Sequence, residues 1–562
     1  MLLSLLLLVL MACSVFIPGL NWGLPSRAAD PFLFDDHPVW SGARIQELAG
    51  PTDDPTRGAD VASETLAARD HPIVVNETDR QRAKIIRRYR LMSHQPDEWN
   101  TLKALSEMKP GRGDFDPKLY QYGGLWVYPV GAMLKSCGVA GLITVRSDVT
   151  YYLDHPEAIG GFYVVARAYS VLWGLVGVVV VYLLVRRICC NGVAAAVAAA
   201  CFMLMPVVVN AAHEAKPHLA GTVLMLLAVL LASRYAMSGS WRAALAAGAL
   251  CGAALGMVLS ALPVFLILPM MAVLRPGPWR IRWRMTIAAT IVGAGVYAVT
   301  NPYPWLNQFS REGRAVVRSN LGTSAGMYRA DWTGRGLPNA ALLLGEGMSF
   351  VLLAAGAVGV IALGWRAVRV RKDSSPDERR RRSTGILLSV PAIWVAIQFA
   401  LLATGKPAEY ARFALYLDVA LLIEAVVAAQ TFLRPPVRCI VLASLIGTTG
   451  WSGLLYTAGF VRDSSTATTR LAAARRVQAM RPRTVAVEFE PAPWSFPPVD
   501  LFGCRLILLP RGRQDGDGAG VLVRPVDLPL DGRNPILRLI TSTPISWASK
   551  PFEVKANPGM VD

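Results

Sequence analysis

The chain has 562 residues, of which 53% are hydrophobic and 17% are charged, and its formal net charge is +18. This balance excludes an ordinary soluble protein, because a single water-facing fold cannot bury so much apolar surface. The positive charge does not indicate nucleic-acid binding, since most Lys and Arg residues lie in short connectors without an interleaved aromatic motif. The eight Cys residues show no CxxC spacing and predict neither a metal site nor a disulfide framework.

Apolar runs long enough to cross a bilayer as helices predict an all-α polytopic membrane protein with about 11 transmembrane helices. The first run, residues 1–20, lacks the basic start of a signal peptide and is expected to stay attached as a helix. The other predicted spans are 162–185, 191–210, 218–234, 243–260, 262–274, 285–300, 346–364, 384–404, 413–431 and 438–458.

Arginine-rich connectors alternate with connectors that carry little positive charge, which predicts the orientation of the chain by the positive-inside rule. The connectors expected in the cytoplasm include Arg186–Arg187, 275–284 and 365–382. The connectors that alternate with them then lie outside, and they contain all six His residues. We therefore expect a multi-pass protein of the inner or plasma membrane with its site on the non-cytoplasmic side.

Four parts are predicted along the chain. A large first outer loop contains amphipathic helices at 80–93 and 97–109, and its residues 50–79 are polar and read as an insertion. Short β-like runs at 484–490 and 504–510 predict a small β-containing outer domain near the C-terminus. The predicted boundaries are 1–20 for the first helix, 21–161 for the outer loop, 162–458 for the membrane core and 459–562 for the C-terminal outer domain.

The motif SHQPDEW places Asp97 and Glu98 at the start of a predicted helix in the first outer loop. Carboxylates in a first helical turn often only complement the helix dipole. Glycosyl transfer from a phosphate donor, however, requires a carboxylate that takes the proton of the acceptor and cations that hold the phosphate. The outer segments supply both kinds of group.

Candidate cations for the donor phosphate lie in two short outer segments. The turn GKPAEYARFALYL contains Lys406 and Arg412, and a guanidinium suits phosphate oxygens well. The segment NAAHEAKPHLA contains Lys216 and His218. Anchoring of these side chains at the membrane interface remains an alternative explanation. Secondary candidates from this segment and a predicted amphipathic helix farther along the chain are His213, Glu214 and Arg318.

A divalent metal such as Mg or Mn is a possible cofactor, because histidines and carboxylates coexist in the outer segments. The ligands would come from separate loops, and no spacing such as HExxH occurs. The sequence therefore leaves metal dependence open.

The residues resemble the GT-C glycosyltransferases of the protein O-mannosyltransferase type, which use polyprenyl-phosphate sugars, over about residues 15–430. NWGLPSR followed by HQPDEW resembles the opening of the family, and YVVARAYSVLWGLVGVVVVYLLVRR resembles its second span. MPVVVNAAHEAKPHLAGTVLMLLAVL, NPYPWLNQF and EYARFALYL resemble later segments in the same order.

This resemblance implies that Asp97 is the catalytic base, that Glu98 assists it, that Arg412 meets the lipid phosphate, and that the anomeric carbon is inverted. The sequence departs from the family in two places. An insertion separates GLPSR from the acidic pair, which makes Asp35 and Asp36 rival candidates for the base, and His218 stands where relatives often carry an acid.

The function expected is transfer of a sugar from a polyprenyl-phosphate donor to a hydroxyl of a protein or glycan acceptor. A transporter or lipid flippase is an alternative, although such proteins usually bury ionisable residues at mid-membrane. Here the predicted spans are almost free of charge, with Asp418 and Glu424 as the clearest exceptions. A catalytically degenerate family member that only binds a lipid is the other alternative.

Overall fold

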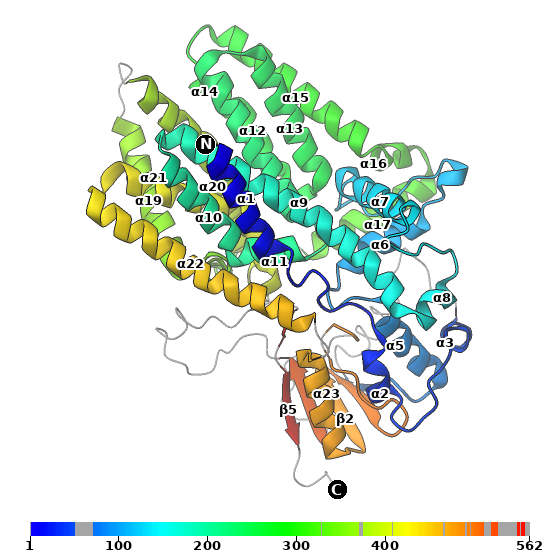
Figure 1. Cartoon of the computed structure of the whole chain (residues 1–562). Helices are drawn as coiled ribbons and strands as arrows, with labels where there is room; N and C mark the ends of the chain where they lie inside the picture. The colour runs from blue at the N-terminus through cyan, green and yellow to red at the C-terminus, as the bar shows by residue number, and fades with distance from the viewer. Residues whose placement is uncertain are drawn as a thin grey trace.

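The computed structural model describes residues 2–50, 71–327, 329–369, 375–406, 408–464, 467–488, 492–494, 496–510, 519–525, 548–550 and 552–556. Most of these residues are helical (Figure 1). The helices before the first long span are α1 (Leu2–Phe16), α2 (Asp30–Leu33), α3 (Gly42–Ala49), α5 (Asp79–Leu91), α6 (Glu98–Glu107), α7 (Gly124–Val139) and α8 (Val149–Asp154), with 3-10 turns η1 (Arg27–Ala29) and η2 (Pro110–Arg112).

A helical bundle follows, to which α1 also belongs. Its helices are α9 (Pro156–Cys189), α10 (Gly192–Leu204), α11 (Pro206–His213), α12 (His218–Ser238), α13 (Trp241–Met257), α14 (Ile267–Leu274), α15 (Trp279–Thr300), α19 (Phe350–Arg369), α20 (Pro376–Leu402), α21 (Leu415–Phe432) and α22 (Pro435–Asp463). Shorter helices and turns between and after them are η3 (Leu259–Leu266), α16 (Tyr303–Leu306), η4 (Asn307–Phe309), α17 (Arg311–Met327), α18 (Gly336–Met348), η5 (Ala408–Ala414) and α23 (Thr469–Met480).

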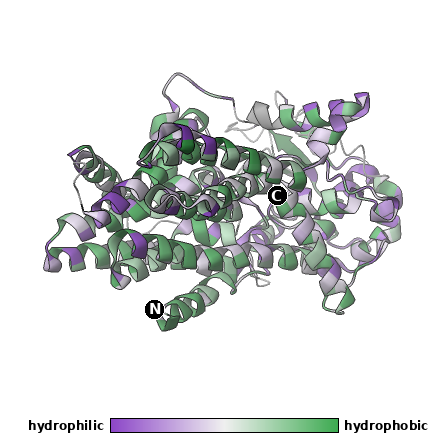
Figure 2. Ribbon diagram, turned by 90° about the horizontal axis from the view of Figure 1, so that it is seen from above, coloured by the Kyte–Doolittle hydropathy of each residue, from purple (hydrophilic) through white to green (hydrophobic). Residues whose placement is uncertain are grey.

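The bundle carries the apolar runs that the sequence predicts as membrane spans, and the chain is an integral membrane protein. Within the described residues, six helices are long and apolar enough to cross a membrane, or up to seven if one bent pair counts as a span. Three further apolar helices are shorter. Each predicted span coincides with helical segments, but the predicted count of eleven is not confirmed. Figure 2 shows α1 as hydrophobic at the edge of the bundle.

The bent pair is α10 and α11, whose axes differ by 56°. The break follows from Pro206, which lacks an N–H group and forces the preceding Met205 into an extended conformation with ψ 125°. As a result α11 ends after eight residues at His213, inside the protein, and the connector to α12 is buried. This connector carries Lys216.

A five-stranded sheet forms the core of a second part, which we call the sheet domain. The strand order is β1-β3-β2-β4-β5, with β1 (Ile73–Val74), β2 (Thr484–Glu488), β3 (Arg505–Leu509), β4 (Val521–Pro525) and β5 (Phe552–Ala556). Strands β2 and β3 confirm the two predicted β-like runs, and they pair in parallel. Strand β1 comes from the first outer loop and pairs antiparallel with β3.

The first outer loop and the C-terminal segment share one hydrophobic core, which the sequence did not predict. Leu33, Ile86 and Leu153 from the loop pack with Val485 and Leu506 from the sheet. Part of the presumed insertion is thus built into the fold, whereas its residues 51–70 lie outside the described residues. The proposed domain boundaries at 161 and 459 therefore separate segments that pack together.

Asn76 links the first loop to the sheet. Its side-chain nitrogen donates hydrogen bonds to the carbonyl oxygens of Leu501 (3.0 Å) and Cys504 (2.7 Å), and its oxygen accepts one from the amide of Leu506 (2.8 Å). The side chain is buried, so these three bonds satisfy polar groups that would otherwise be costly to bury. Segments that come before and after the membrane core in the sequence are thereby held in one unit.

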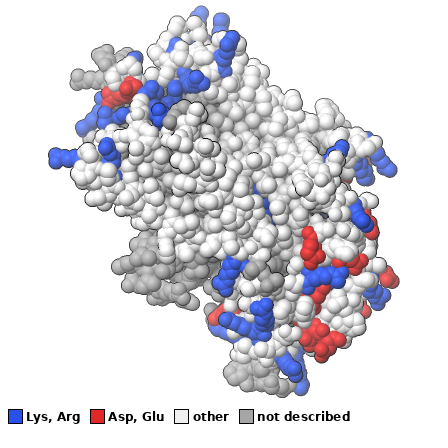
Figure 3. All heavy atoms as spheres, in the orientation of Figure 1, with Lys and Arg blue, Asp and Glu red and all other residues white. Residues whose placement is uncertain are grey.

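Charged residues gather at two ends of the molecule. Figure 3 shows many Lys and Arg residues and one small patch of acids at the end of the bundle that lies away from the sheet domain, whereas acids and bases mix on the sheet domain. The described residues at the first end include Arg234, Arg242, Arg280 and Arg284.

Candidate active site

Three connectors converge on one carboxylate at the boundary between the bundle and the first loop. Asp97 precedes α6, Lys216 lies between α11 and α12, and Arg412 lies in η5. Oδ2 of Asp97 is 2.9 Å from Nζ of Lys216 and 3.1 Å from Nη2 of Arg412. The structure thus brings together the predicted base and two of the predicted phosphate ligands.

The two cations control the charge of Asp97. Burial acts to raise the pKa of this carboxyl group, but the positive charges of Lys216 and Arg412 outweigh it and hold the pKa well below its ordinary value. The carboxylate is therefore ionised at neutral pH. Its side chain is 30% exposed, whereas that of Lys216 is 2% exposed. Asp97 can thus be reached from outside, while the lysine is fixed behind it.

The environment of Lys216 fixes its position. Its ammonium group also lies 3.1 Å from Oε2 of Glu214, a carboxylate that is buried as deeply as the lysine. The backbone carbonyl of Glu214 accepts a hydrogen bond from Ser170 Oγ at 2.6 Å. Two acids therefore share one lysine, and the predicted secondary candidate Glu214 joins the cluster through it.

Arg412 is fixed by its own turn. Its Nη1 donates to the carbonyl oxygen of Glu409 at 2.7 Å, and its guanidinium lies over the ring of Phe413 (4.8 Å) and near that of Tyr410 (5.4 Å). Such stacking orients the planar group and costs little hydration. Lys406 Nζ lies 4.9 Å from the ring of Tyr410, so it contacts the same aromatic side chain.

An apolar cavity of about 590 Å³ opens beside this cluster. It is lined by His218 and Phe413, and by Trp394, Leu402 and other apolar residues of α20. A small neighbouring cavity shares His218 and Phe413 with it and is also lined by Arg412. The guanidinium of Arg412 thus stands where the apolar space meets the ion cluster.

The predicted ligand His218 lines the cavity rather than the ion pairs. It is the first residue of α12, it is buried, and its ring meets the edges of Phe413 (5.0 Å) and Tyr122 (6.1 Å). All three aromatic residues line the 590 Å³ cavity. His218 is therefore placed to shape the entrance to the cavity.

Glu98 is placed very differently from Asp97. It is fully buried, and its two oxygens accept from Nε (2.8 Å) and Nη2 (2.7 Å) of Arg167 in α9. It also accepts from Ser93 Oγ (2.6 Å) and from the backbone amide of Ala215 (2.8 Å). Four donors surround this carboxylate, so the geometry favours positioning over the predicted catalytic assistance.

Arg167 is the functional neighbour that the sequence interpretation missed. Its Nη1 donates to the carbonyl oxygens of Leu20 and Trp22, both at 2.7 Å, and its guanidinium lies 4.7 Å from the Trp22 ring. Arg167 with Glu98 thereby ties the segment after α1 to α6 and α9. The signal was present, because an arginine inside an apolar span is rare and needs an internal acid.

The remaining predicted residues lie outside the cluster. His213 contacts the carbonyl oxygens of Val209 and Pro18 with its two ring nitrogens and stacks on Phe460 at 4.2 Å. Asp35 and Asp36 are exposed, and Asp35 accepts a hydrogen bond from Gln478 at 2.9 Å. Arg318 is exposed on α17. Among the described contacts, none joins these three residues to Lys216 or Arg412.

The described part of the chain contains no group of three or more His, Cys, Asp or Glu side chains that could hold a metal ion. Asp97 and Glu214 share Lys216, a cation that already occupies the space between them.

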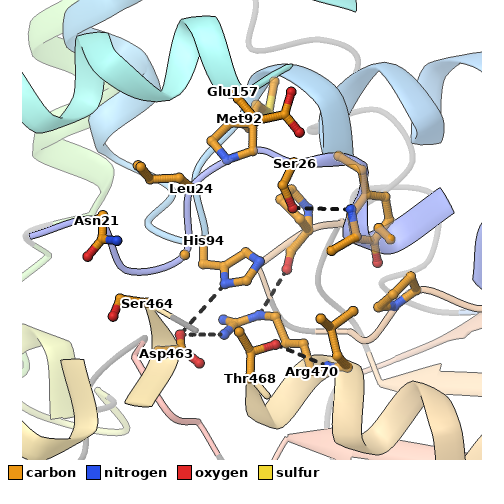
Figure 4. Close-up of a pocket in the computed structure, with 18 residues that line it drawn as sticks. Asn21, Leu24, Ser26, Met92, His94, Glu157, Asp463, Ser464, Thr468 and Arg470 are labelled. Carbon is orange, nitrogen blue, oxygen red and sulfur yellow. Dashed lines mark hydrogen bonds and ion pairs between the residues drawn. The ribbon is translucent and has the colours of Figure 1, made fainter. Parts of the chain in front are cut away.

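A second cavity of about 320 Å³ lies between the bundle and the sheet domain (Figure 4). Asp463 at the end of α22 faces it, with Oδ2 3.7 Å from Nδ1 of His94 and 3.6 Å from Nη1 of Arg470 in α23. Burial and the charge of Arg470 lower the pKa of His94 to about 4, so its ring is neutral at pH 7. His94 stands three residues before Asp97, so this cavity adjoins the loop that carries the candidate base.

The solved structures that this chain resembles include ArnT and AglB. ArnT from Cupriavidus metallidurans, in a crystal structure with undecaprenyl phosphate, is 16% identical, with 75% of this chain and 73% of that chain covered and a TM-score of 0.41. The oligosaccharyltransferase AglB from Archaeoglobus fulgidus, in complex with an inhibitory peptide and a dolichol-phosphate, is 13% identical, with 64% and 50% covered and a TM-score of 0.36. Identities this low do not align individual site residues.

A comparison with curated proteins finds no match. The family model for dolichyl-phosphate-mannose-protein mannosyltransferases matches residues 158–305, which run from α9 to α16 and include Arg167 and Lys216. The match covers the central part of the region over which the sequence resembles GT-C enzymes. It confirms that resemblance over residues 158–305, and the chain is a glycosyltransferase similar over this segment to the dolichyl-phosphate-mannose-protein mannosyltransferases.

Proposed function

We propose that this chain transfers a sugar from a polyprenyl-phosphate donor to a hydroxyl group of a protein or glycan acceptor, with Asp97 as the base. One observation carries the proposal. An ionised, partly exposed carboxylate stands between two fixed cations at the edge of an apolar cavity. A base, a phosphate-binding group and a space for a lipid chain are thus adjacent.

The donor would place its phosphate at Arg412 and its first prenyl units in the 590 Å³ cavity. A guanidinium offers two parallel donors to phosphate oxygens, which suits Arg412 at the junction of the cavity and the ion cluster. The apolar lining from α20 and the ring of Phe413 would shield the prenyl chain from water. Lys406, 4.9 Å from the ring of Tyr410, would add a further positive charge.

The chemical step needs only these groups. Asp97 would take the proton from the acceptor hydroxyl while the hydroxyl oxygen forms a bond to the anomeric carbon of the sugar. The bond from that carbon to the phosphate oxygen breaks, and the electron pair leaves with the polyprenyl phosphate. Arg412 and Lys216 would stabilise the charge that develops on the leaving phosphate. A single displacement of this kind inverts the anomeric carbon.

Donor binding would also adjust the strength of the base. Without the donor, both cations are engaged by Oδ2 of Asp97, which keeps its pKa low and its basicity weak. A donor phosphate would compete for Arg412 and weaken that ion pair. The pKa of Asp97 would then rise toward its ordinary value, and the carboxylate would become a better proton acceptor when the donor is in place.

The active site would face the non-cytoplasmic side of the inner or plasma membrane. Lys and Arg residues outnumber the acids at the end of the bundle away from the sheet domain (Figure 3). By the positive-inside rule that end is cytoplasmic, and Asp97 immediately precedes α6, which lies away from that end (Figure 1). The acceptor would therefore be presented outside the cytoplasm.

The test is the substitution Asp97→Asn, measured in purified full-length protein with polyprenyl-phosphate-mannose and related hexose donors and a cell-envelope extract as acceptor. Release of polyprenyl phosphate should fall by about 10³-fold, within the range for loss of a general base. Asp36→Asn is the matched control, since Asp36 is an exposed rival acid outside the cluster, and it should keep normal release. If Asp36→Asn abolished release and Asp97→Asn did not, the base would be misassigned.

A further inference from the structure

A cavity lined by arginines lies at the opposite end of the bundle from Asp97. Its volume is about 500 Å³, and its lining includes Arg187, Arg234 and Arg242 but no acidic residue. The three arginines come from three elements, namely the last turn of α9, the last turns of α12 and the first turn of α13. Topology requires arginines at a cytoplasmic end, but it does not require that they surround one cavity.

One of the arginines is held in place by a neighbouring helix. Nε of Arg187 donates to Oγ of Ser233 in α12 at 3.1 Å, and this hydroxyl in turn donates to the carbonyl oxygen of Leu230 at 2.9 Å. Ser233 is fully buried. This bond limits the orientations of the guanidinium, because the group is planar and rigid.

The positive charge around the cavity has no counterpart in the described part of the chain. None of the three arginines forms an ion pair with a described acid, and Arg380 adds further positive charge near Arg187. The acid next to Arg380 is Asp377, and it is already paired with Arg380 at 2.7 Å. Arginines held around one cavity repel each other, so an anion bound among them would relieve the repulsion.

Aromatic residues indicate that the cavity lies at the level of lipid headgroups. Trp241 at the start of α13 is 57% exposed, and the guanidinium of Arg242 lies 5.5 Å from its ring. Trp279 at the start of α15, at the same end of the bundle, is 62% exposed. Tryptophan is enriched where a membrane protein meets the headgroup layer, because its ring is apolar and its N–H is polar.

We propose that this cavity is a binding site for a phosphate group, carried by the headgroup of an anionic phospholipid of the cytoplasmic leaflet. Guanidinium groups bind phosphate oxygens through paired hydrogen bonds, and basic pockets between membrane helices suit phosphorylated headgroups. A volume of about 500 Å³ is in the range of small-molecule pockets. The site is separate from the proposed donor site and does not depend on the proposed activity.

The test measures lipid binding to delipidated full-length protein by native mass spectrometry. Phosphatidylglycerol, phosphatidylcholine and inorganic phosphate serve as three separate probes. The wild type should bind phosphatidylglycerol, and a triple variant Arg187→Gln, Arg234→Gln, Arg242→Gln should bind it at least about 10-fold more weakly. The matched control Arg280→Gln removes an exposed arginine from the same end outside the cavity, and it should bind normally.

The probes distinguish the sources of the phosphate. Strong binding of phosphatidylglycerol with weak binding of inorganic phosphate supports the lipid, whereas equal binding of the two would overturn the assignment to a lipid. Phosphatidylcholine that bound as tightly as phosphatidylglycerol would overturn the role of the net negative charge. A second variant, Ala246→Phe, fills the cavity and keeps every arginine, so it should also weaken binding even if the triple variant fails to fold.

Discussion

Asp97 and Glu98 are neighbours in the chain, yet the regions around them differ in every property that matters for chemistry. Glu98 is fully buried, and four donors surround its two oxygens. Asp97 is 30% exposed, and both of its cations contact the single oxygen Oδ2. A saturated carboxylate cannot take a proton without breaking its own bonds, whereas an exposed one can accept a proton on its remaining oxygen.

The difference shows how one short motif can supply both a support and a reactive group. The ion pair of Glu98 with Arg167 is of the buried kind, whose loss leaves an uncompensated charge inside the protein. The ion pairs of Asp97 are of the exchangeable kind, because a phosphate can replace the carboxylate at Arg412. Substitutions in the first region should therefore affect folding, and substitutions in the second region should affect turnover.

The largest effect on stability is expected for Glu98→Gln. This change leaves Arg167 buried without a counter-charge, which typically costs about 3–5 kcal/mol. Thermal unfolding of the purified protein should occur well below the wild-type temperature. The double variant Glu98→Gln with Arg167→Met removes both charges and should regain most of the loss. A double variant no more stable than the single variant would mean that the ion pair is not the source of the effect.

Arg412→Gln should reduce turnover rather than stability. The variant loses the charge that contacts both Asp97 and the proposed donor phosphate, so release of polyprenyl phosphate should fall by about 10²- to 10³-fold. Arg412→Lys keeps the charge without the planar fork and should recover part of the rate. A rate for Arg412→Gln within about 3-fold of wild type would separate Arg412 from the reaction.

His94 gives a prediction for the pH dependence of stability. Burial and Arg470 lower the pKa of His94 to about 4, below the ordinary value of 6.5. The neutral ring is thus preferred in the folded state, and its contribution to stability is complete above pH 6.5 and is lost as the pH falls from 6.5 toward 4. In the variant His94→Gln, the free energy of unfolding should fall by about 2 kcal/mol less than in the wild type over this pH range. An unchanged slope in the variant would contradict a buried neutral ring.

The smallest expected effect is the dependence of kcat/KM on acid pH. The depressed pKa of Asp97 keeps the free enzyme ionised, so kcat/KM should show no acid limb between about pH 5 and 8. The acid limb of kcat should lie at higher pH than that of kcat/KM, because bound donor competes for Arg412 and so raises the pKa of Asp97. Stability from the Asp97 ion pairs is likewise present above about pH 4 and is lost only as the pH falls through the lowered pKa. A kcat/KM limb near pH 6.5 would point to a histidine instead.

The sequence predicts the fold well where the signal is local. Apolar runs locate the long helices, and the β-branched runs at 484–490 and 504–510 locate β2 and β3. The union of β1 with the C-terminal strands could not be predicted, because two residues carry no strand pattern. The number of spans could not be predicted either, because Pro206 divides one apolar run into two short helices.

The contacts of the candidate site could not be predicted either, because they join residues that lie far apart in the sequence. The sequence singles out Asp97, Lys216 and Arg412 as polar residues in outer connectors. Only packing brings the two cations within 3.1 Å of Oδ2 of Asp97. The separate role of Glu98 depends on Arg167, which is 69 residues away in an apolar helix. No local pattern distinguishes the two acids of the motif.

The most direct test compares Asp97→Asn with Glu98→Gln in one experiment, with the release of polyprenyl phosphate and the unfolding temperature measured on each preparation. We predict that Asp97→Asn unfolds near the wild-type temperature and releases about 10³-fold less polyprenyl phosphate, and that Glu98→Gln unfolds early while its folded fraction retains turnover. The opposite pattern, in which Asp97→Asn is active and folded Glu98→Gln is not, would contradict the assignment of Asp97 as the base.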